Sequence, residues 1–186
     1  GLQMKLSVNL STRDLMDQDL PDKIARLLGT HGVEPGGLIL EITESAIMDD
    51  PQRALTTLER LHDMGLKLSI DDFGTGYSSL AYLKRLPVDE LKIDKSFVMN
   101  MESDIHDAKI VRSTVDLAHN LGLSVVAEGM ESAKSWKLLA GLRCDEAQGF
   151  FIAKPMPAEQ FAQWARQWTP PHIANERLGT EFAAML

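Results

Sequence analysis

Acidic side chains recur at the ends of short apolar runs in this chain of 186 residues. Glu41 and Glu44 close the run Leu-Glu-Ile-Thr-Glu, the adjacent pair Asp71 and Asp72 closes Ser-Ile-Asp-Asp, and Glu128 ends Val-Val-Ala-Glu. Taken singly, each acid has an ordinary explanation, because such residues are common where a strand turns toward a helix. Gathered at one site, they would repel one another unless protons or cations lay between them.

Other polar residues follow the same pattern, namely Asn9, Lys92, Asp94 and Gln148. An unpaired ammonium would be costly at Lys92, which lies between two apolar residues, so we expect carboxylates beside it. The alternative is a lysine whose stem packs while its ammonium reaches solvent. Oxygen ligands of this kind suit Mg²⁺ or Mn²⁺, and the sequence has no His-x-His or His-Glu-x-x-His pattern that would favour zinc.

The pair Asp71-Asp72 is the sharpest local feature, because one carboxylate can bridge two ions while its neighbour binds one. The chain continues as Phe73-Gly74, as in the metal-binding loop of protein kinases. A kinase is excluded, since no His-Arg-Asp lies upstream and no Ala-Pro-Glu follows. The glycine-rich stretch that follows could cradle a phosphate, although a plain connecting loop explains it equally well.

Composition narrows the classes of partner. A net charge of −8 argues against a nucleic-acid polymer, whose binding needs a basic stripe. The single cysteine, Cys144, excludes an internal disulfide framework and favours a reducing, cytoplasmic setting. If the parent protein is anchored in a membrane, we expect this part of it to be a cytoplasmic domain. No apolar run has the length of a membrane span, and the start of the chain does not resemble a signal peptide, so we expect no direct membrane contact.

Short β-rich runs alternate with helical patterns at the spacing of a βα unit, which predicts parallel strands joined by crossover helices. The predicted strands are Leu6–Leu10, Leu38–Thr43, Leu66–Ile70, Glu90–Ile93, Leu123–Ala127 and Gln148–Ile152. The predicted helices are Leu20–Leu28, Pro51–Met64, Ser78–Leu86, Asp104–Leu121, Ser132–Leu142 and Ala158–Trp168. Residues 1–168 then form one domain, and residues 169–186, which open with two prolines, form a tail.

We predict the fold class α/β, a TIM-type (β/α)8 barrel of which about six βα units are present. A full barrel needs about 250 residues, so the chain is about two units short. An open, doubly wound sheet is the alternative. The polar residues favour the barrel, because the carboxyl ends of its strands surround one mouth.

Six segments in order together resemble the EAL-domain cyclic-di-GMP phosphodiesterases, over about residues 5 to 168. They are Ser7-Val8-Asn9-Leu10-Ser11, Leu40-Glu41-Ile42-Thr43-Glu44, Asp71-Asp72-Phe73-Gly74-Thr75-Gly76, Leu91-Lys92-Ile93-Asp94, Ala127-Glu128-Gly129-Met130-Glu131, and Gln148-Gly149 to Lys154-Pro155. The resemblance implies a barrel that cleaves one phosphodiester of cyclic di-GMP to give linear pGpG, with two Mg²⁺ or Mn²⁺ ions per site.

The resemblance also implies a role for each matching residue. The first metal ion would be bound by Asn9, Glu41 and Asp71, and the second by Asp71 and Asp72. The catalytic residues, placed near the attacking water, would be Lys92, Glu128 and Gln148. Glu44 would anchor the loop from Asp72 to Ser79, whose residues Phe73, Gly74, Thr75 and Gly76 would serve dimerisation and metal binding. Substrate contacts would come from Asp94 and Pro155.

The sequence departs from the family pattern at its start, where the opening strand and the Glu-Ala-Leu strand are absent, with a metal-binding glutamate and a substrate-binding arginine. We therefore expect this chain to be weakly active or inactive, although its parent protein keeps the rest of the catalytic set. Two exposed sheet edges predict a homodimer or a strand-exchanged assembly. Sensory or GGDEF-type domains would lie upstream in the parent.

Two other functions stay open. A receptor that binds cyclic di-GMP without cleaving it is one, although such members of the family usually lose the metal-binding acids, which are present here. Another metal-dependent barrel, such as a lyase acting through an enolate, is the second, and failure to bind cyclic di-GMP would favour it.

Overall fold

A computed structural model describes residues 4–76 and 80–171 of the chain. These residues contain one six-stranded sheet, with strand order β1-β2-β3-β4-β5-β6 and every neighbouring pair parallel. The strands are β1 (Leu6–Leu10), β2 (Leu38–Thr43), β3 (Lys67–Phe73), β4 (Glu90–Ile93), β5 (Ser124–Glu128) and β6 (Glu146–Gln148). Because the order never reverses, the doubly wound alternative is wrong, and the sheet is the curved wall of a barrel.

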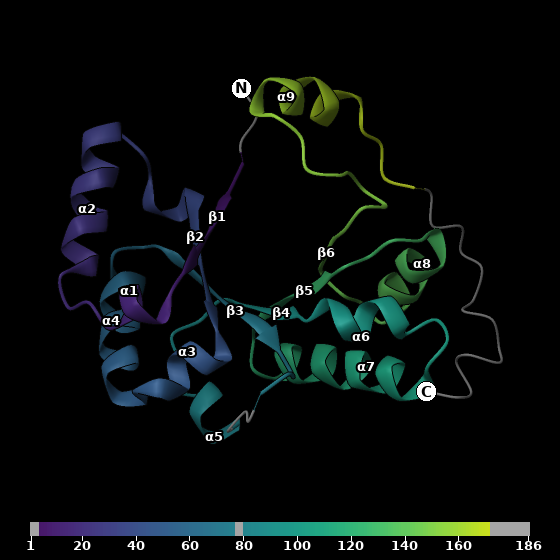
Figure 1. Ribbon diagram of the computed structural model, residues 1–186, viewed down its shortest axis with the longest axis horizontal. Coiled ribbons are helices and arrows are strands. Elements are labelled where there is room, and N and C mark those ends of the chain that lie inside the picture. Colours follow the sequence, from purple (N-terminus) through teal and green to yellow (C-terminus); the bar gives the residue numbers. More distant parts are fainter. Residues whose placement is uncertain (1–3, 77–79, 172–186) are drawn as a thin grey trace.

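Helices join successive strands, as parallel pairing requires. They are α1 (Thr12–Leu15), α2 (Leu20–His31), α3 (Glu44–Asp49), α4 (Pro51–Asp63), α5 (Leu80–Leu83), α6 (Lys95–Asn100), α7 (Ile105–Asn120), α8 (Ala133–Gly141) and α9 (Ala158–Gln167), with a 3₁₀ turn η1 (Pro35–Gly37). In Figure 1, α1 to α5 lie at the left and lower left, α6 to α8 lie at the right and lower right, and α9 lies apart from them at the top, near the N-terminal end.

Helix α4 illustrates how the local sequence sets an element. The Asp50 side chain accepts a hydrogen bond from the backbone N–H of Arg53 at 3.2 Å, and Pro51 occupies the first turn, where its missing N–H costs nothing. The apolar face of this helix belongs to the core, because Leu58 and Leu61 are fully buried. Burial of a leucine side chain of this kind stabilises the fold by about 1.5–3 kcal/mol.

Two predicted elements differ from the structure. The strand predicted over Gln148–Ile152 is wrong, because β6 ends at Gln148 and the chain then turns, with the Ile152 N–H donating to the Gly149 carbonyl at 3.0 Å. Gly149 forces this turn, since it lies so close to the Met130 backbone that a Cβ atom would be 2.0 Å from the Met130 oxygen. The helix predicted over Ser78–Leu86 is shorter, as α5, and residues 78 and 79 lie outside the described residues.

Three short helices were not predicted, namely α1, α3 and α6. Each begins at or just after the polar end of a strand, so it turns the chain outward directly beyond the candidate site. Strand β3 also runs to Phe73 rather than Ile70 and therefore includes both adjacent aspartates. Within the described ranges, no helix has both the length and the apolar character needed to cross a membrane.

Candidate metal centre

Lys92, in the middle of β4, is the hub of a buried ion network. Its Nζ atom lies 3.0 Å from Glu41 Oε2, 3.2 Å from Asp71 Oδ1 and 2.6 Å from Glu128 Oε1. These carboxylates come from β2, β3 and β5, so four neighbouring strands meet here. The Lys92 side chain is only 5% exposed, which confirms the predicted need for carboxylates and shows that an ammonium directed into solvent was the wrong alternative.

The protonation state of Lys92 follows from its surroundings. Burial opposes the charged form, but hydrogen bonds to Glu128 and Glu41 and the nearby charge of Asp71 outweigh it, so the pKa of Lys92 lies above its ordinary value. An ammonium offers three donors, and three carboxylates accept them. Lys92 is therefore a fixed positive charge at neutral pH.

Asp71, Asp72 and Glu128 form a cluster that fits a divalent cation. Each offers one carboxylate oxygen, and these oxygens all lie within 4.8 Å of one another. The pKa of Asp72 is raised, first by burial and then by the negative charge of Asp71. A bound cation would relieve this repulsion, and an all-oxygen set of ligands matches Mg²⁺ or Mn²⁺.

The backbone of β3 makes this cluster possible. The β3–β4 pairing shifts register between Ile70 and Phe73, and Asp72 adopts a left-handed conformation with φ of 53°. Such a conformation is uncommon outside glycine, although aspartate tolerates it better than most residues. The bulge therefore sits at the two acidic residues, as is common next to functional sites.

Asp94 has a structural role in addition to the predicted substrate contact. It caps α6, because its Oδ1 accepts hydrogen bonds from the backbone N–H of Ser96, at 2.9 Å, and from the Ser96 hydroxyl. Burial raises the pKa of Asp94, but the bonds from Ser96 outweigh burial and lower it overall. The carboxyl groups of Asp72 and Asp94 also influence each other, an interaction that raises the pKa of Asp72 and lowers that of Asp94.

The remaining predicted site residues lie around this network. Asn9 on β1 pairs in register with Glu41, and Gln148 on β6 pairs in register with Glu128. Both are exposed, at opposite sides of the sheet, since β1 and β6 are its outer strands. Pro155 and Gln148 line the same surface cavity.

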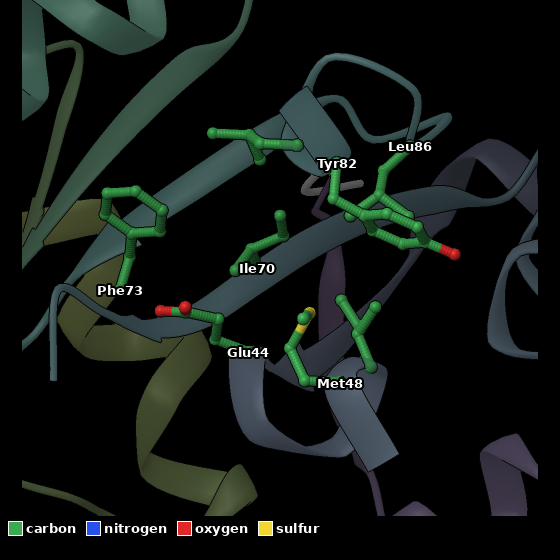
Figure 2. Close-up of a pocket in the computed structure, with 8 residues that line it drawn as sticks. Glu44, Met48, Ile70, Phe73, Tyr82 and Leu86 are labelled. Carbon is green, nitrogen blue, oxygen red and sulfur yellow. The ribbon is translucent and has the colours of Figure 1, made fainter. Parts of the chain in front are cut away.

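Glu44, at the start of α3, lies beneath the glycine-rich loop. It is 9% exposed, and neither carboxylate oxygen has a hydrogen-bond partner among residues 4–76 and 80–171. A Cβ atom on Gly76 would lie 3.4 Å from this carboxylate, so the loop passes directly beside it. Figure 2 shows the Glu44 carboxylate directed toward Phe73, at one side of a pocket that Met48 and Tyr82 also line. Residues 77–79 of the predicted loop lie outside the described residues.

Two buried polar residues near the network were not predicted. The Ser69 hydroxyl donates to Glu90 Oε1 at 2.8 Å, and both residues are buried. Burial raises the pKa of Glu90, partly offset by the hydrogen bond from Ser69. Because side chains alternate along a strand, Glu90 shares a face with Lys92 and Ser69 shares one with Asp71, a signal that was present in the sequence.

Comparison with known proteins places the geometry in a family context. The family described as "EAL domain" matches residues 1–155. The bifunctional diguanylate cyclase/cyclic di-GMP phosphodiesterase MucR of Pseudomonas aeruginosa is 48% identical over 155 residues, which cover 83% of this chain and 23% of MucR. The chain spans between 20% and 26% of the length of the curated relatives that it matches.

Solved structures agree. The PaMucR phosphodiesterase in complex with c-di-GMP superposes with a TM-score of 0.82 at 48% identity, covering 84% of this chain and 64% of that one. BlrP1 of Klebsiella pneumoniae, in a manganese/cy-diGMP complex, gives a TM-score of 0.77 at 32% identity, covering 82% of this chain and 39% of that one.

Proposed function

We propose that this chain, which belongs to the EAL domain family, carries most of the catalytic site of an enzyme that hydrolyses one phosphodiester bond of cyclic di-GMP to linear pGpG with two divalent cations, Mg²⁺ or Mn²⁺, and that the 186-residue chain by itself is weakly active or inactive. The observation that carries the proposal is the Lys92 ammonium held by three carboxylates from three other strands. The name of MucR and the c-di-GMP bound to PaMucR support the choice of substrate.

The metal ligands in this proposal are Asn9, Glu41 and Asp71 for one ion, and Asp71 and Asp72 for the other. Of these acids, Glu41 and Asp71 both contact Lys92, and the carboxylates of Asp71 and Asp72 converge with that of Glu128, the proposed proton acceptor. When bound, divalent cations acidify water and neutralise phosphate oxygens. The manganese in the BlrP1 complex supports this choice of metal.

The chain's own residues would divide the proton chemistry. Glu128, which lies at the end of β5 with its side chain 18% exposed, is the carboxylate that accepts a proton from the attacking water. Lys92 keeps its own proton and orients Glu128 through the 2.6 Å contact. Gln148, level with Glu128 on the next strand, is placed to orient the water or the phosphate. Attack forms the bond from phosphorus to the water oxygen and breaks the bond to the 3′ oxygen, which takes up a proton from solvent as Glu128 releases the proton that it accepted.

We also propose a cytoplasmic setting and a homodimer or strand-exchanged assembly, with residues 1–168 as the EAL domain. The loop from Phe73 to Gly76 next to Glu44, and the contacts of Asp94 and Pro155 with substrate, belong to the same proposal. Light scattering tests the assembly, because a strictly monomeric chain would contradict it.

Replacing Asp71 by asparagine tests the function. Asp71→Asn keeps the shape of the side chain but removes the charge that both metal sites share, so Mn²⁺ affinity should fall by at least about 100-fold, together with pGpG formation. Asp63→Asn, an equivalent change on the exposed end of α4, is the matched control and should change neither. Calorimetry measures the metal and chromatography measures pGpG.

The outcome separates the alternatives. Unchanged Mn²⁺ binding in Asp71→Asn would refute the metal centre. If the missing amino-terminal strands are restored and the protein binds cyclic di-GMP and Mn²⁺ but forms no pGpG, it would instead be a receptor. Protein that does not bind cyclic di-GMP at all would favour a different metal-dependent reaction.

A further inference from the structure

The segment 129–132, directly after Glu128, leads from β5 into α8. Gly129 has φ of 72° and lies against α6 so tightly that a Cβ atom there would be 2.6 Å from Lys95 Cβ. The Met130 N–H donates to the Gln148 carbonyl at 3.1 Å, and the Met130 carbonyl accepts from Phe151 at 3.2 Å. The segment is thus in contact with α6 on one side and with the end of β6 on the other.

A third attachment comes from Glu102, in the turn between α6 and α7. Glu102 Oε1 accepts hydrogen bonds from the Ser132 hydroxyl, from the Ser135 hydroxyl at 2.5 Å and from the Ser135 N–H at 3.1 Å. The Lys134 ammonium donates to the Glu102 carbonyl at 3.3 Å. One residue of the connection that follows the Lys92 strand therefore binds the beginning of the helix that follows the Glu128 strand.

We infer that Glu102 is a positioning residue for the reaction, which holds the segment 129–132 so that Glu128 stays in contact with Lys92. This inference rests on the proposed function, because Glu128 is the proposed proton acceptor. One unit of the chain runs from Lys92 on β4 through α6 to Glu102. The neighbouring unit runs from Glu128, the last residue of β5, to Ser132, the residue before α8. The 2.6 Å contact joins these two units at one end, and the Glu102 hydrogen bonds join them at the other.

The chemistry of the contact explains why a carboxylate serves here. The first turn of α8 presents free N–H groups and the positive end of the helix dipole, and a negative charge at this point is favourable. The hydrogen bonds from Ser132 and Ser135 lower the pKa of Glu102, so it is ionised at neutral pH and its bonds are charge-assisted. The side-chain contacts of Glu102 are with Ser132 and Ser135, at the far end of the segment from Glu128, so its role is positional rather than catalytic.

The test compares Glu102→Ala with Asp104→Ala in the 186-residue chain. Asp104 is a matched control, because it lies in the same turn but caps α7 instead, with its Oδ1 accepting a hydrogen bond from the His106 N–H at 2.7 Å. Three measurements are made: kcat and KM for cyclic di-GMP with Mn²⁺, hydrogen exchange of the Met130 amide, and the ¹⁵N resonance of the Lys92 ammonium. The last two need neither metal nor substrate.

In Glu102→Ala we expect kcat to fall about 10- to 100-fold with KM nearly unchanged, because displacement of a catalytic group by about 1 Å costs that much. The Met130 amide should exchange faster, and the Lys92 resonance should shift. Glu102→Gln, which keeps an acceptor oxygen for Ser132 and Ser135, should recover part of the loss. Asp104→Ala should leave kcat, the Met130 exchange and the Lys92 resonance as in wild type.

Equal behaviour of Glu102→Ala and Asp104→Ala in the Met130 exchange and the Lys92 resonance would overturn the inference. A raised KM with unchanged kcat would also overturn it, because it would indicate a substrate contact instead. A shifted Lys92 resonance in a chain whose wild type does not bind cyclic di-GMP would keep the positioning role and refute the proposed function alone.

Discussion

Replacing Lys92 by methionine removes the ammonium and keeps a side chain of similar length, so it isolates the charge at the hub of the network. The Lys92 side chain is 5% exposed, and its partners Glu41, Asp71 and Glu128 are 9%, 14% and 18% exposed. Removing one partner from a buried ion pair costs about 3–5 kcal/mol. With three carboxylates left together, we expect the upper part of this range, a large share of the 5–15 kcal/mol typical of a whole domain.

The matched control is Lys67→Met, two strand positions before Ser69. Lys67 pairs with Asp89 at 2.6 Å, but their side chains are 46% and 24% exposed. Exposed pairs of this kind are worth about 0.2–1 kcal/mol. Asp89 also keeps its hydrogen bond from the Leu68 N–H, at 3.0 Å, when the lysine is gone. The two lysines thus differ in burial and in the number of carboxylates that they contact.

Urea unfolding followed by circular dichroism gives the free energies of unfolding of both variants, with the slope m as a check that the unfolded state is unchanged.

The pH dependence of the stabilisation by Lys92 has a defined sign. The pKa of Lys92 is raised above its ordinary 10.5, so its stabilisation is complete below about that pH and is lost as the pH rises through the folded-state value. The deficit of Lys92→Met should narrow on acidification to about pH 4, because protons then neutralise the unpaired acids. A loss within about 1 kcal/mol of the Lys67→Met loss at pH 7 would refute the described network.

Two further predictions concern the neighbourhood of β6. Burial raises the pKa of the Cys144 thiol to about 12, so iodoacetamide at pH 8 should label it far more slowly in the folded protein than in urea; equal rates by mass spectrometry would contradict its placement. Gly149→Ala should destabilise the protein by about 1–3 kcal/mol or more in the same urea assay, because the new Cβ would meet the Met130 backbone. Gly29 lies within α2 with nothing within 4 Å of a new Cβ atom, so Gly29→Ala should instead raise the free energy of unfolding by about 0.5–1 kcal/mol. A loss of stability in Gly29→Ala would contradict the attribution of the Gly149→Ala effect to the contact with Met130.

The sequence predicted the strands well where apolar runs were long and bounded by polar residues. Leu6–Leu10, Leu38–Thr43 and Glu90–Ile93 were predicted with the bounds that the structure shows. The end of β6 could not be predicted, because it depends on the approach of Gly149 to Met130, nearly twenty residues earlier in the chain. Alternation and composition describe local preference, and they do not report such a contact between distant segments.

The candidate site could likewise be predicted only in part from the sequence. The convergence of Glu41, Asp71 and Glu128 on Lys92 followed from their places near the carboxyl ends of parallel strands and is confirmed by the distances. The role of Glu102 was not predicted, because its partners lie thirty or more residues away and a glutamate in a turn has no distinctive pattern. The roles of Asn9 and Gln148 as ligand and catalytic residue remain predictions.

The left-handed backbone at Asp72 means that two neighbouring aspartates in the sequence are not sufficient to form the candidate metal centre. In a regular extended strand, consecutive side chains point to opposite faces, and one of the two acids would be turned toward the helices. Grafting the Asp-Asp dipeptide onto a strand without a bulge would therefore place only one of the two carboxylates at the metal-binding face. Conversely, a substitution at Ile70 or Phe73 that straightened β3 would disrupt the candidate metal centre although none of its acidic residues had been replaced.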